Sequence, residues 1–355
     1  MLNVQVLGAS YGLLLSAKIL LAGHNVRLIC TQAECETIDS EGFRVRLPIA
    51  GKKRDCLELY SGDLPGRLET ATPTRARAQD TDLVVFAMQE PQYRAPELRT
   101  LLSSIAAAKV PCLSIMNMPP LPFLQRFSGI DQQACRPAYT DASVWSDFDP
   151  ALVSHCSADP QAVRPASGAV NELEVRLATN FRAAPFDGEA QTQMLCELAA
   201  SIENAKRKSS GQDGALPVKL KVYPSLYTGL TKLPMLVTGN YRCFTEGGIR
   251  SIKDAVHQDL DLSRSVYESV CEVLRGIGCP AETLIPFDKY AAAANSLVEP
   301  SSAAKAVNRG VTAIERVDVL VQCMASQQGT RITSLDEVVA RVDGRLADNR
   351  AASDA

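Results

Sequence analysis

The first thirty residues constrain the fold of this chain more than any other segment. An apolar stretch from Val4 to Leu7 predicts a strand, a glycine-containing turn follows, and an apolar run from Leu13 to Leu21 predicts a helix. After a short polar turn, the apolar residues from Val26 to Ile29 predict a second strand. Strand, turn, helix and strand in this order form the βαβ unit that opens a doubly wound, mostly parallel sheet.

The turn of this unit has the residue types of a dinucleotide-binding loop. Its sequence is Gly8, Ala9, Ser10, Tyr11, Gly12. Glycines permit a tight turn and a close approach of the backbone, so a pyrophosphate can lie at the positive end of the following helix. The spacing departs from the usual G-x-G-x-x-G, because the two glycines stand four positions apart. We expect these five residues to contact a dinucleotide, although a turn required only for packing remains an alternative.

Composition excludes several classes of partner. The 355 residues are enough for two domains, and a net charge of −3 gives no electrostatic basis for binding nucleic acid or an anionic membrane. Eleven scattered cysteines without a C-x-x-C pair argue against a disulfide framework or a structural zinc site, and no other metal-ligand spacing is present. The chain begins almost at once with a strand rather than a leader, so we expect a cytoplasmic protein. Because the metal-ligand spacings are missing, we expect no bound metal.

The pattern that follows continues the alternation of helices and strands. Strands are predicted over 42–47, 82–88 and 111–116, a helix over 94–108, and the sequence over 51–80 is a polar stretch. The run from Asp82 to Met88 is continuously apolar after its first residue, as expected for a strand buried on both faces of a parallel sheet. The fold class is therefore α/β, with ligands expected at the carboxyl ends of the strands.

The second half of the chain changes from strands to helices. Short alternating strands are predicted over 134–186, followed by a helix over 191–205, a polar loop over 209–214 and a strand over 217–223. Beyond residue 225 the period is helical, with helices predicted over 226–244, 262–276, 281–297, 302–325 and 334–346. We therefore predict a dinucleotide-binding domain over 1–224, a helical substrate and dimerisation domain over 225–346, and a polar tail over 347–355.

Lys232 is the main candidate for acid catalysis. An enzyme that reduces a ketone needs a donor that stabilises the developing alkoxide, and lysine can serve. Positions 232, 236 and 240 would share one face of a regular helix, so Lys232 and Asn240 are expected to point together into a cleft between the domains.

Three segments resemble the ketopantoate reductase family. Residues 219–233 resemble the strand and helix start that precede the family's catalytic lysine, and residues 114–117 resemble a strand that ends in a ligand-binding asparagine. Ser301 and Ser302, with residues 309–315, resemble its Ser-Ser and Thr-Glu-Ile-Asp signature. The matches follow one another in the family's order along most of the chain.

The resemblance implies a Rossmann-type domain, a helical domain like that of 6-phosphogluconate dehydrogenase, and NADPH-dependent reduction of a 2-oxo acid. Lys232 would donate a proton to the substrate carbonyl or polarise it. Asn117 and Asn240 would orient substrate or ribose, and Ser302 would bind the substrate carboxylate.

Several positions depart from the family pattern. Thr31 stands where the family has an arginine for the 2′-phosphate of NADPH, and Gln89 stands where it has a lysine. Thr31 and Gln89 are both expected beside the cofactor, and the choice between NADP and NAD remains open. On the substrate side, Leu236 replaces an asparagine and Ala313 aligns with the catalytic glutamate. A slip in this alignment would let Glu315 supply that carboxylate, three positions before Asp318 on one helix face.

The main expectation is an NAD(P)-dependent oxidoreductase acting on ketopantoate or a related ketone, as a possible homodimer. A non-catalytic paralogue that binds a nucleotide or metabolite is the first alternative, favoured by the altered cofactor contacts. Another dehydrogenase of the superfamily, of the hydroxyacid or opine type, is the second.

Overall fold

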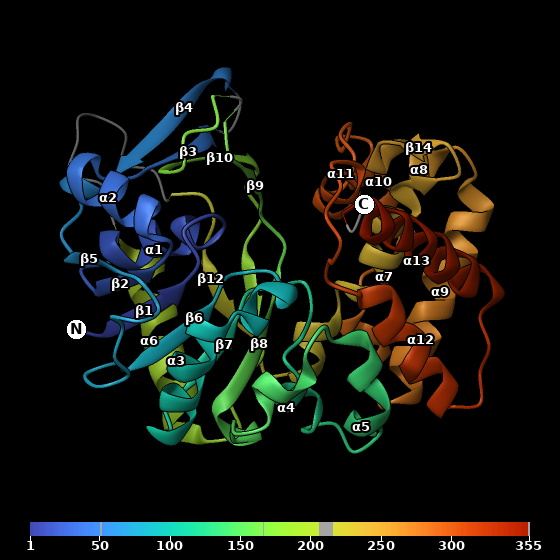
Figure 1. Ribbon diagram of the computed structural model, residues 1–355, viewed down its shortest axis with the longest axis horizontal. Coiled ribbons are helices and arrows are strands. Elements are labelled where there is room, and N and C mark those ends of the chain that lie inside the picture. The colour runs from blue at the N-terminus through green and yellow to red at the C-terminus, as the bar shows by residue number, and fades with distance from the viewer. Residues whose placement is uncertain (50–51, 166, 206–215, 354–355) are drawn as a thin grey trace. The chain divides into compact units, whose positions relative to one another are not determined.

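The computed structural model describes residues 1–49, 52–165, 167–205 and 216–353, and it divides into two compact units (Figure 1). The first unit comprises residues 1–88, 92–123 and 143–229, and the second comprises 89–91, 124–142 and 230–355. The predicted loop over 209–214 lies outside the described residues. None of the described helices is both long and apolar enough to cross a membrane.

The strands and helices have the following bounds. The strands of the first unit are β1 Asn3–Leu7, β2 Asn25–Ile29, β3 Arg44–Ile49, β4 Lys52–Tyr60, β5 Leu68–Ala71, β6 Leu83–Phe86, β7 Cys112–Ser114, β8 Val153–Ala158, β9 Gln161–Val163, β10 Glu172–Leu177, β11 Phe181–Ala183 and β12 Leu220–Val222. Its longer helices are α1 Gly12–Leu21, α2 Gln32–Glu41, α3 Pro96–Ala107 and α6 Glu189–Asn204. The second unit contains α5 Gln132–Cys135, α7 Leu233–Met235, β13 Phe244–Thr245, β14 Gly248–Ile249, α8 Ile252–His257, α9 Leu260–Gly276, α10 Phe287–Ala294, α11 Ser302–Asn308, α12 Val317–Gln327 and α13 Thr333–Ser353.

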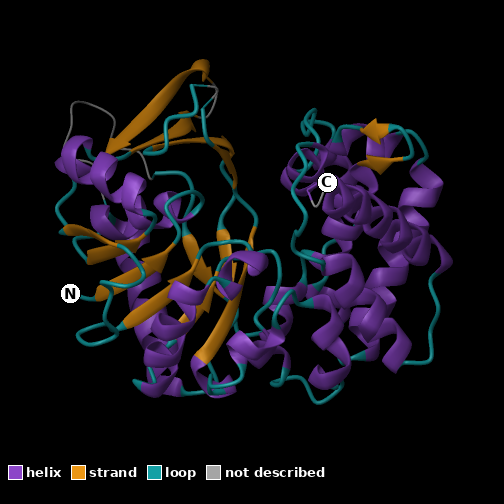
Figure 2. Ribbon diagram, in the orientation of Figure 1, coloured by secondary structure: helices purple, strands orange, loops and turns teal. Residues whose placement is uncertain are grey.

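The main sheet of the first unit has eight strands with helices on both sides (Figure 2), in the order β12-β11-β8-β7-β6-β1-β2-β5. Its pairings are parallel except for β8 with β11. The sheet, with the helical second unit, confirms the predicted fold class. The chain builds β2 and β5 on one side of β1 and then β6, β7 and β8 on the other, so the strand order reverses at β1. Ligands of doubly wound sheets bind beside such a reversal, at the carboxyl ends of the strands.

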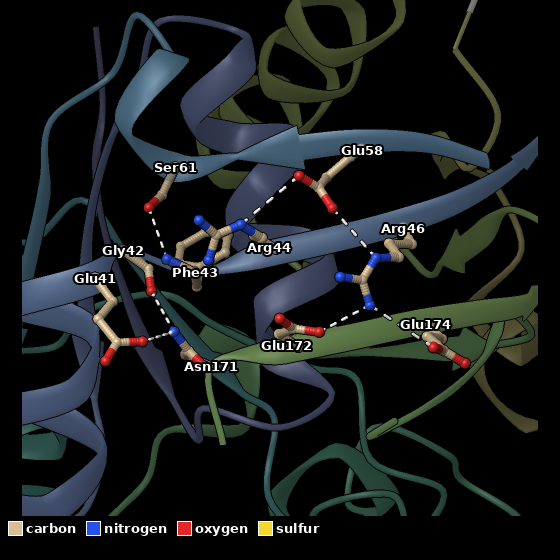
Figure 3. A network of polar contacts seen from close by, with 10 residues as sticks. All are labelled: Glu41, Gly42, Phe43, Arg44, Arg46, Glu58, Ser61, Asn171, Glu172 and Glu174. Carbon is tan, nitrogen blue, oxygen red and sulfur yellow. Dashed lines mark hydrogen bonds and ion pairs between the residues drawn. The ribbon is translucent and has the colours of Figure 1, made fainter. Parts of the chain in front are cut away.

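This unit contains a second sheet that was not predicted from the sequence. Its order is β4-β3-β10-β9, so the predicted polar stretch over 51–80 in fact contains β4, as well as β5 of the main sheet. Buried Leu59 of β4 stands between Glu58 and Tyr60, whose side chains lie on the opposite, more polar face of the strand. Arg46 of β3 crosses this face and pairs with Glu58 at 3.2 Å and Glu172 at 2.7 Å (Figure 3).

The helix predicted over 226–244 is instead a series of short turns. A 3-10 turn covers Leu226–Leu230, α7 begins after Lys232, a π-helical turn covers Leu236–Asn240, and a further 3-10 turn ends at Cys243. Pro234 lacks a backbone N–H and fits only the first turn of a helix, which explains why α7 begins just before it. The equal spacing of positions 232, 236 and 240 therefore does not place them on one α-helical face.

Two further helix predictions were wrong in extent. The segment predicted as one helix over 302–325 is split into α11 and α12, and Gly310 between them has φ of +93°, which an α-helix cannot accommodate. The segment predicted over 281–297 contains a 3-10 turn and the shorter α10, which begins directly after Pro286. At the other end, α13 continues to Ser353 through most of the predicted polar tail.

Candidate functional site

The glycine turn lies at the carboxyl end of β1, where the strand order reverses. Backbone hydrogen bonds align the ends of four neighbouring strands there: Ile115 N to Phe86 O at 2.9 Å, Ala87 N to Leu7 O at 3.0 Å, and Gly8 N to Ile29 O at 2.8 Å. The residues predicted to bind the cofactor thus share one edge of the sheet. They are the five residues of the turn, Thr31 after β2 and Asn117 after β7. Asn117 is half-buried at this edge.

Gly8 is required by both conformation and packing. Its φ is +117°, and a Cβ added there would lie 2.6 Å from Met88 Cγ and 3.2 Å from the Ala87 carbonyl carbon. At the other end of the turn, a Cβ on Gly12 would lie 2.9 Å from Val6 Cγ1. The two glycines therefore let the turn pack closely against β1 and the end of β6.

The backbone of the turn has unused donors. Within the described part of the chain, the N–H groups of Ala9, Ser10, Tyr11 and Gly12 have no hydrogen-bond acceptor, whereas Leu13 N and Leu14 N already donate to Ser10 O and Tyr11 O. Four successive N–H groups at the start of α1 form a cradle that suits the oxygens of a pyrophosphate. The residues present therefore fit a dinucleotide, through their backbone rather than through charged side chains.

The side chain of Tyr11 is committed within the protein. Its hydroxyl donates to the carbonyl oxygen of Pro160 at 2.7 Å, and its ring meets Phe181 edge to face at a centroid distance of 5.9 Å. Desolvation, assisted by nearby Cys156 and Asp159, raises the Tyr11 pKa well above its ordinary value, so the hydroxyl stays a donor. Tyr11 anchors the turn to the segment between β8 and β9.

Thr31 caps helix α2 together with Glu34. The Thr31 hydroxyl accepts from Glu34 N at 3.3 Å, and the Glu34 carboxylate accepts from Thr31 N at 3.0 Å and from the Thr31 hydroxyl at 2.9 Å. This reciprocal arrangement is a capping box. The same carboxylate is ion-paired with Arg164, which follows β9. Sequence analysis missed Arg164 because it lies 130 positions away and no local motif marks it.

The remaining predicted residues belong to the second unit. Gln89 is exposed directly after Met88, and Lys232 is half-buried at the start of α7, where its carbonyl oxygen accepts from Leu236 N at 3.0 Å. Leu236 itself is buried in the core of the unit.

Ser301, and not Ser302, is the structurally engaged member of the Ser-Ser pair. The Ser301 hydroxyl accepts from Ala304 N at 3.2 Å as the N-cap of α11 and donates to Asn240 O at 2.8 Å. Ser302 is the exposed first residue of the helix. The Ser301 contact fixes the backbone at half-buried Asn240, and the Asn240 side chain is not involved in it.

Glu315 lies in the irregular segment before α12, so the prediction that it shares a helix face with Asp318 was wrong. It is buried, with 6% of its surface exposed. The Tyr241 hydroxyl donates to the Glu315 carbonyl oxygen and accepts from Val317 N at 3.0 Å. Tyr241 follows Asn240 directly, so it holds the two predicted site segments together. Burial raises the Tyr241 pKa, and the hydroxyl remains protonated.

A cavity of about 660 Å³ in the second unit contains none of these residues. It is lined by the end of α12, the start of α13 and Ala134, with Cys323 and Arg331 among its walls. Among the described residues no group of three or more His, Cys, Asp or Glu side chains could hold a metal ion.

Comparisons with known proteins identify the fold. No family model and no curated protein matches the sequence. Among solved structures, 2-dehydropantoate 2-reductase from Methylococcus capsulatus is similar with a TM-score of 0.67 and 15% identity, over 98% of both chains. A PanE/ApbA family ketopantoate reductase from Ralstonia eutropha JMP134 has a TM-score of 0.61 and 15% identity, over 98% of this chain and 99% of its own. D-Mandelate dehydrogenase with NADH and anilino(oxo)acetate has a TM-score of 0.64 and 11% identity over the same shares.

These three proteins share the fold of this chain over nearly its full length. The resemblance to ketopantoate reductases expected from the sequence is thus confirmed in the fold, at a sequence identity of 15%.

Proposed function

We propose that this protein is an NAD(P)H-dependent oxidoreductase that reduces a 2-oxo acid, ketopantoate or a related ketone, to the 2-hydroxy acid. The observation that carries the proposal is the cradle of four unused backbone N–H groups in the turn from Ala9 to Gly12. The cradle lies where the strand order of the sheet reverses, which is the usual place for a dinucleotide. The shared fold with ketopantoate reductases and with a dehydrogenase that binds NADH supports the same assignment.

Bound NAD(P)H would supply the hydride, and the chain would supply orientation and a proton. The turn from Gly8 to Gly12 would hold the pyrophosphate, with Thr31, Gln89 and Asn117 beside the rest of the cofactor. Backbone donors suit this role because they are fixed by the turn and need no side-chain ordering.

Three side chains are assigned to the substrate, and a fourth is assigned to the lysine among them. The Lys232 ammonium would donate a proton to the carbonyl oxygen and stabilise the alkoxide that develops there. Asn240 and Ser302 would bind the substrate. Glu315 would supply the carboxylate that keeps the lysine charged and oriented, because an opposite charge nearby favours the ammonium form.

Three finer assignments belong to the same proposal. A homodimer is proposed because the structurally similar ketopantoate reductase from Staphylococcus aureus is described as dimeric. The cytoplasm is proposed because all eleven cysteines are free thiols and eight of them are buried. Domain limits of 1–224 and 225–346 are proposed for the cofactor and substrate parts.

The test combines cofactor binding with turnover. NADPH and NADH are titrated by fluorescence, and a panel of 2-oxo acids that includes ketopantoate is then mixed with enzyme and cofactor. The proposal expects one cofactor to bind at micromolar concentration and at least one 2-oxo acid to cause its oxidation. Absence of binding of both cofactors below about 1 mM would overturn the proposal. Tight binding without turnover of any 2-oxo acid would favour the non-catalytic paralogue instead.

A further inference from the structure

The end of β2 carries an ion pair between two distant parts of the first unit. Arg164 Nη2 and Glu34 Oε1 are 2.5 Å apart, and the same Glu34 carboxylate accepts from Thr31. Thr31 is the second residue after β2. Arg164 follows β9 of the four-stranded sheet, so a cation from that sheet reaches the carboxyl edge of the eight-stranded one.

The two charges of this pair differ in what they can still offer to a ligand. The Glu34 side chain is 14% exposed and its carboxylate already accepts from three donors. The Arg164 side chain is 34% exposed. Of the five guanidinium N–H bonds, the described contacts use one, which goes from Nη2 to Glu34. Nε is buried without an acceptor among the described residues, so the terminal Nη1 and Nη2 groups are the donors left for a ligand. The charge available at this edge is therefore positive.

The position of this cation defines its ligand. In a doubly wound dinucleotide fold, the residues after the second strand meet the ribose of the adenosine, where a carboxylate suits a 2′-hydroxyl and an arginine suits a 2′-phosphate. Thr31 is engaged in the capping box and carries no charge. Glu34 already accepts from three donors of its own unit, which leaves the guanidinium of Arg164 as the charged donor available at this edge.

We propose that Arg164 binds the 2′-phosphate of NADPH and selects NADPH over NADH, with Glu34 as the residue that positions it. The inference rests on the proposed function, because it assumes that the glycine turn holds the pyrophosphate of the same molecule. It assigns the cofactor contact to a residue far from the second strand in sequence. Arginine suits phosphate because its planar fork can donate two parallel hydrogen bonds.

The first experiment measures NADPH and NADH binding by calorimetry for the wild type, Arg164→Met and the control Arg27→Met. Arg27 lies on β2, pairs with Glu69 and is 32% exposed, but it precedes the end of the strand. We expect Arg164→Met to weaken NADPH binding by about 10- to 100-fold, the range of a lost charged hydrogen bond. NADH binding should change by less than about twofold, as expected for a contact made only by the 2′-phosphate, and Arg27→Met should change neither.

A second pair of variants separates direct contact from charge balance. Arg164→Lys keeps the charge and should retain part of the preference for NADPH. In Arg164→Met combined with Glu34→Gln, no unpaired carboxylate remains, and NADPH binding should still be weak. Recovery of NADPH binding in the double variant would overturn a direct contact, because Arg164 would then only neutralise Glu34.

The outcomes also separate this inference from the proposed function. Wild-type protein that binds NADH as tightly as NADPH, or Arg164→Met that weakens both equally, would overturn the inference and leave the oxidoreductase intact. Failure of both cofactors to bind the wild type would overturn the two together. Retained NADH binding by Arg164→Met shows that the variant is folded.

Discussion

Arg316 clamps the buried carboxylate of Asp318 with two parallel hydrogen bonds. Nε lies 3.0 Å from Oδ1 and Nη2 lies 2.9 Å from Oδ2, while Nη1 reaches Asp343. The Asp318 side chain is fully buried, and this burial raises its pKa, against the opposing effect of the guanidinium. The ion pair lies where the segment that contains Glu315 joins the start of α12. It therefore fixes the first turn of this helix.

Arg316→Met should therefore destabilise the protein by about 3–5 kcal/mol at neutral pH, because it leaves a buried carboxylate without its partner. Urea unfolding measures the loss. The control is Arg331→Met, whose ion pair with Asp336 is formed by a guanidinium that is 84% exposed, so its loss should change stability far less. Equal losses in the two variants would contradict the assignment of a buried clamp.

A second prediction concerns Gly8 in the glycine turn. Gly8→Ala should destabilise the first unit by about 2–4 kcal/mol, since it combines an unfavourable φ with a Cβ 2.6 Å from Met88. Gly23→Ala, where φ is +81° and the space is open, isolates the backbone effect and should lose about 1–2 kcal/mol. Gly247→Ala meets no neighbour and should change stability by less than about 0.5 kcal/mol. Denaturant midpoints of the three variants test this order.

Lys18 of α1 should make stability depend on alkaline pH. It is 2% exposed, and burial, with a smaller effect of Lys219, lowers its pKa to about 8. The unfolded chain then binds more protons between about pH 8 and the ordinary lysine value near 10.5, so wild-type stability from this group rises with pH across that window.

Lys18→Met should consequently be more stable than the wild type at pH 7, by on the order of 2–3 kcal/mol, and this difference should shrink towards pH 10. Unfolding by urea at both pH values gives the comparison. A difference that stayed constant with pH would show that burial does not lower the pKa of Lys18.

The sequence predicted the first βαβ unit well because its signals are local. Alternating or continuous apolar residues define β1, α1 and β2, and the glycines of the turn have a conformational reason that holds within a few residues. The same reasoning found β7 and also β6, whose continuous apolar run is typical of a strand buried on both faces.

The helical unit was harder to predict because its breaks depend on packing. The apolar period over 226–244 suits a regular helix, yet Pro234 and the close fit of Gly239 under Tyr290 accompany short turns of different pitch. Glu315 was expected on a helix, but α11 ends at Asn308, Gly310 has a positive φ, and the next helix begins only at Val317.

The charge at the cofactor edge could not be predicted at all from local sequence. Thr31 and Glu34 form a recognisable capping box, but their partner Arg164 comes from another sheet. Pairings of this kind depend on the tertiary fold, and a single sequence carries no signal for them.

Loss of turnover without loss of cofactor binding in Lys232→Met tests the central claim most directly. The lysine is proposed to act only on the substrate carbonyl, so kcat with NADPH and the best 2-oxo acid should fall by about 10²- to 10⁴-fold while NADPH affinity stays unchanged. Lys253→Met, which alters an exposed lysine of the same unit, should keep wild-type kcat. Unchanged kcat in Lys232→Met would contradict the account, because some other group would then have to protonate the substrate.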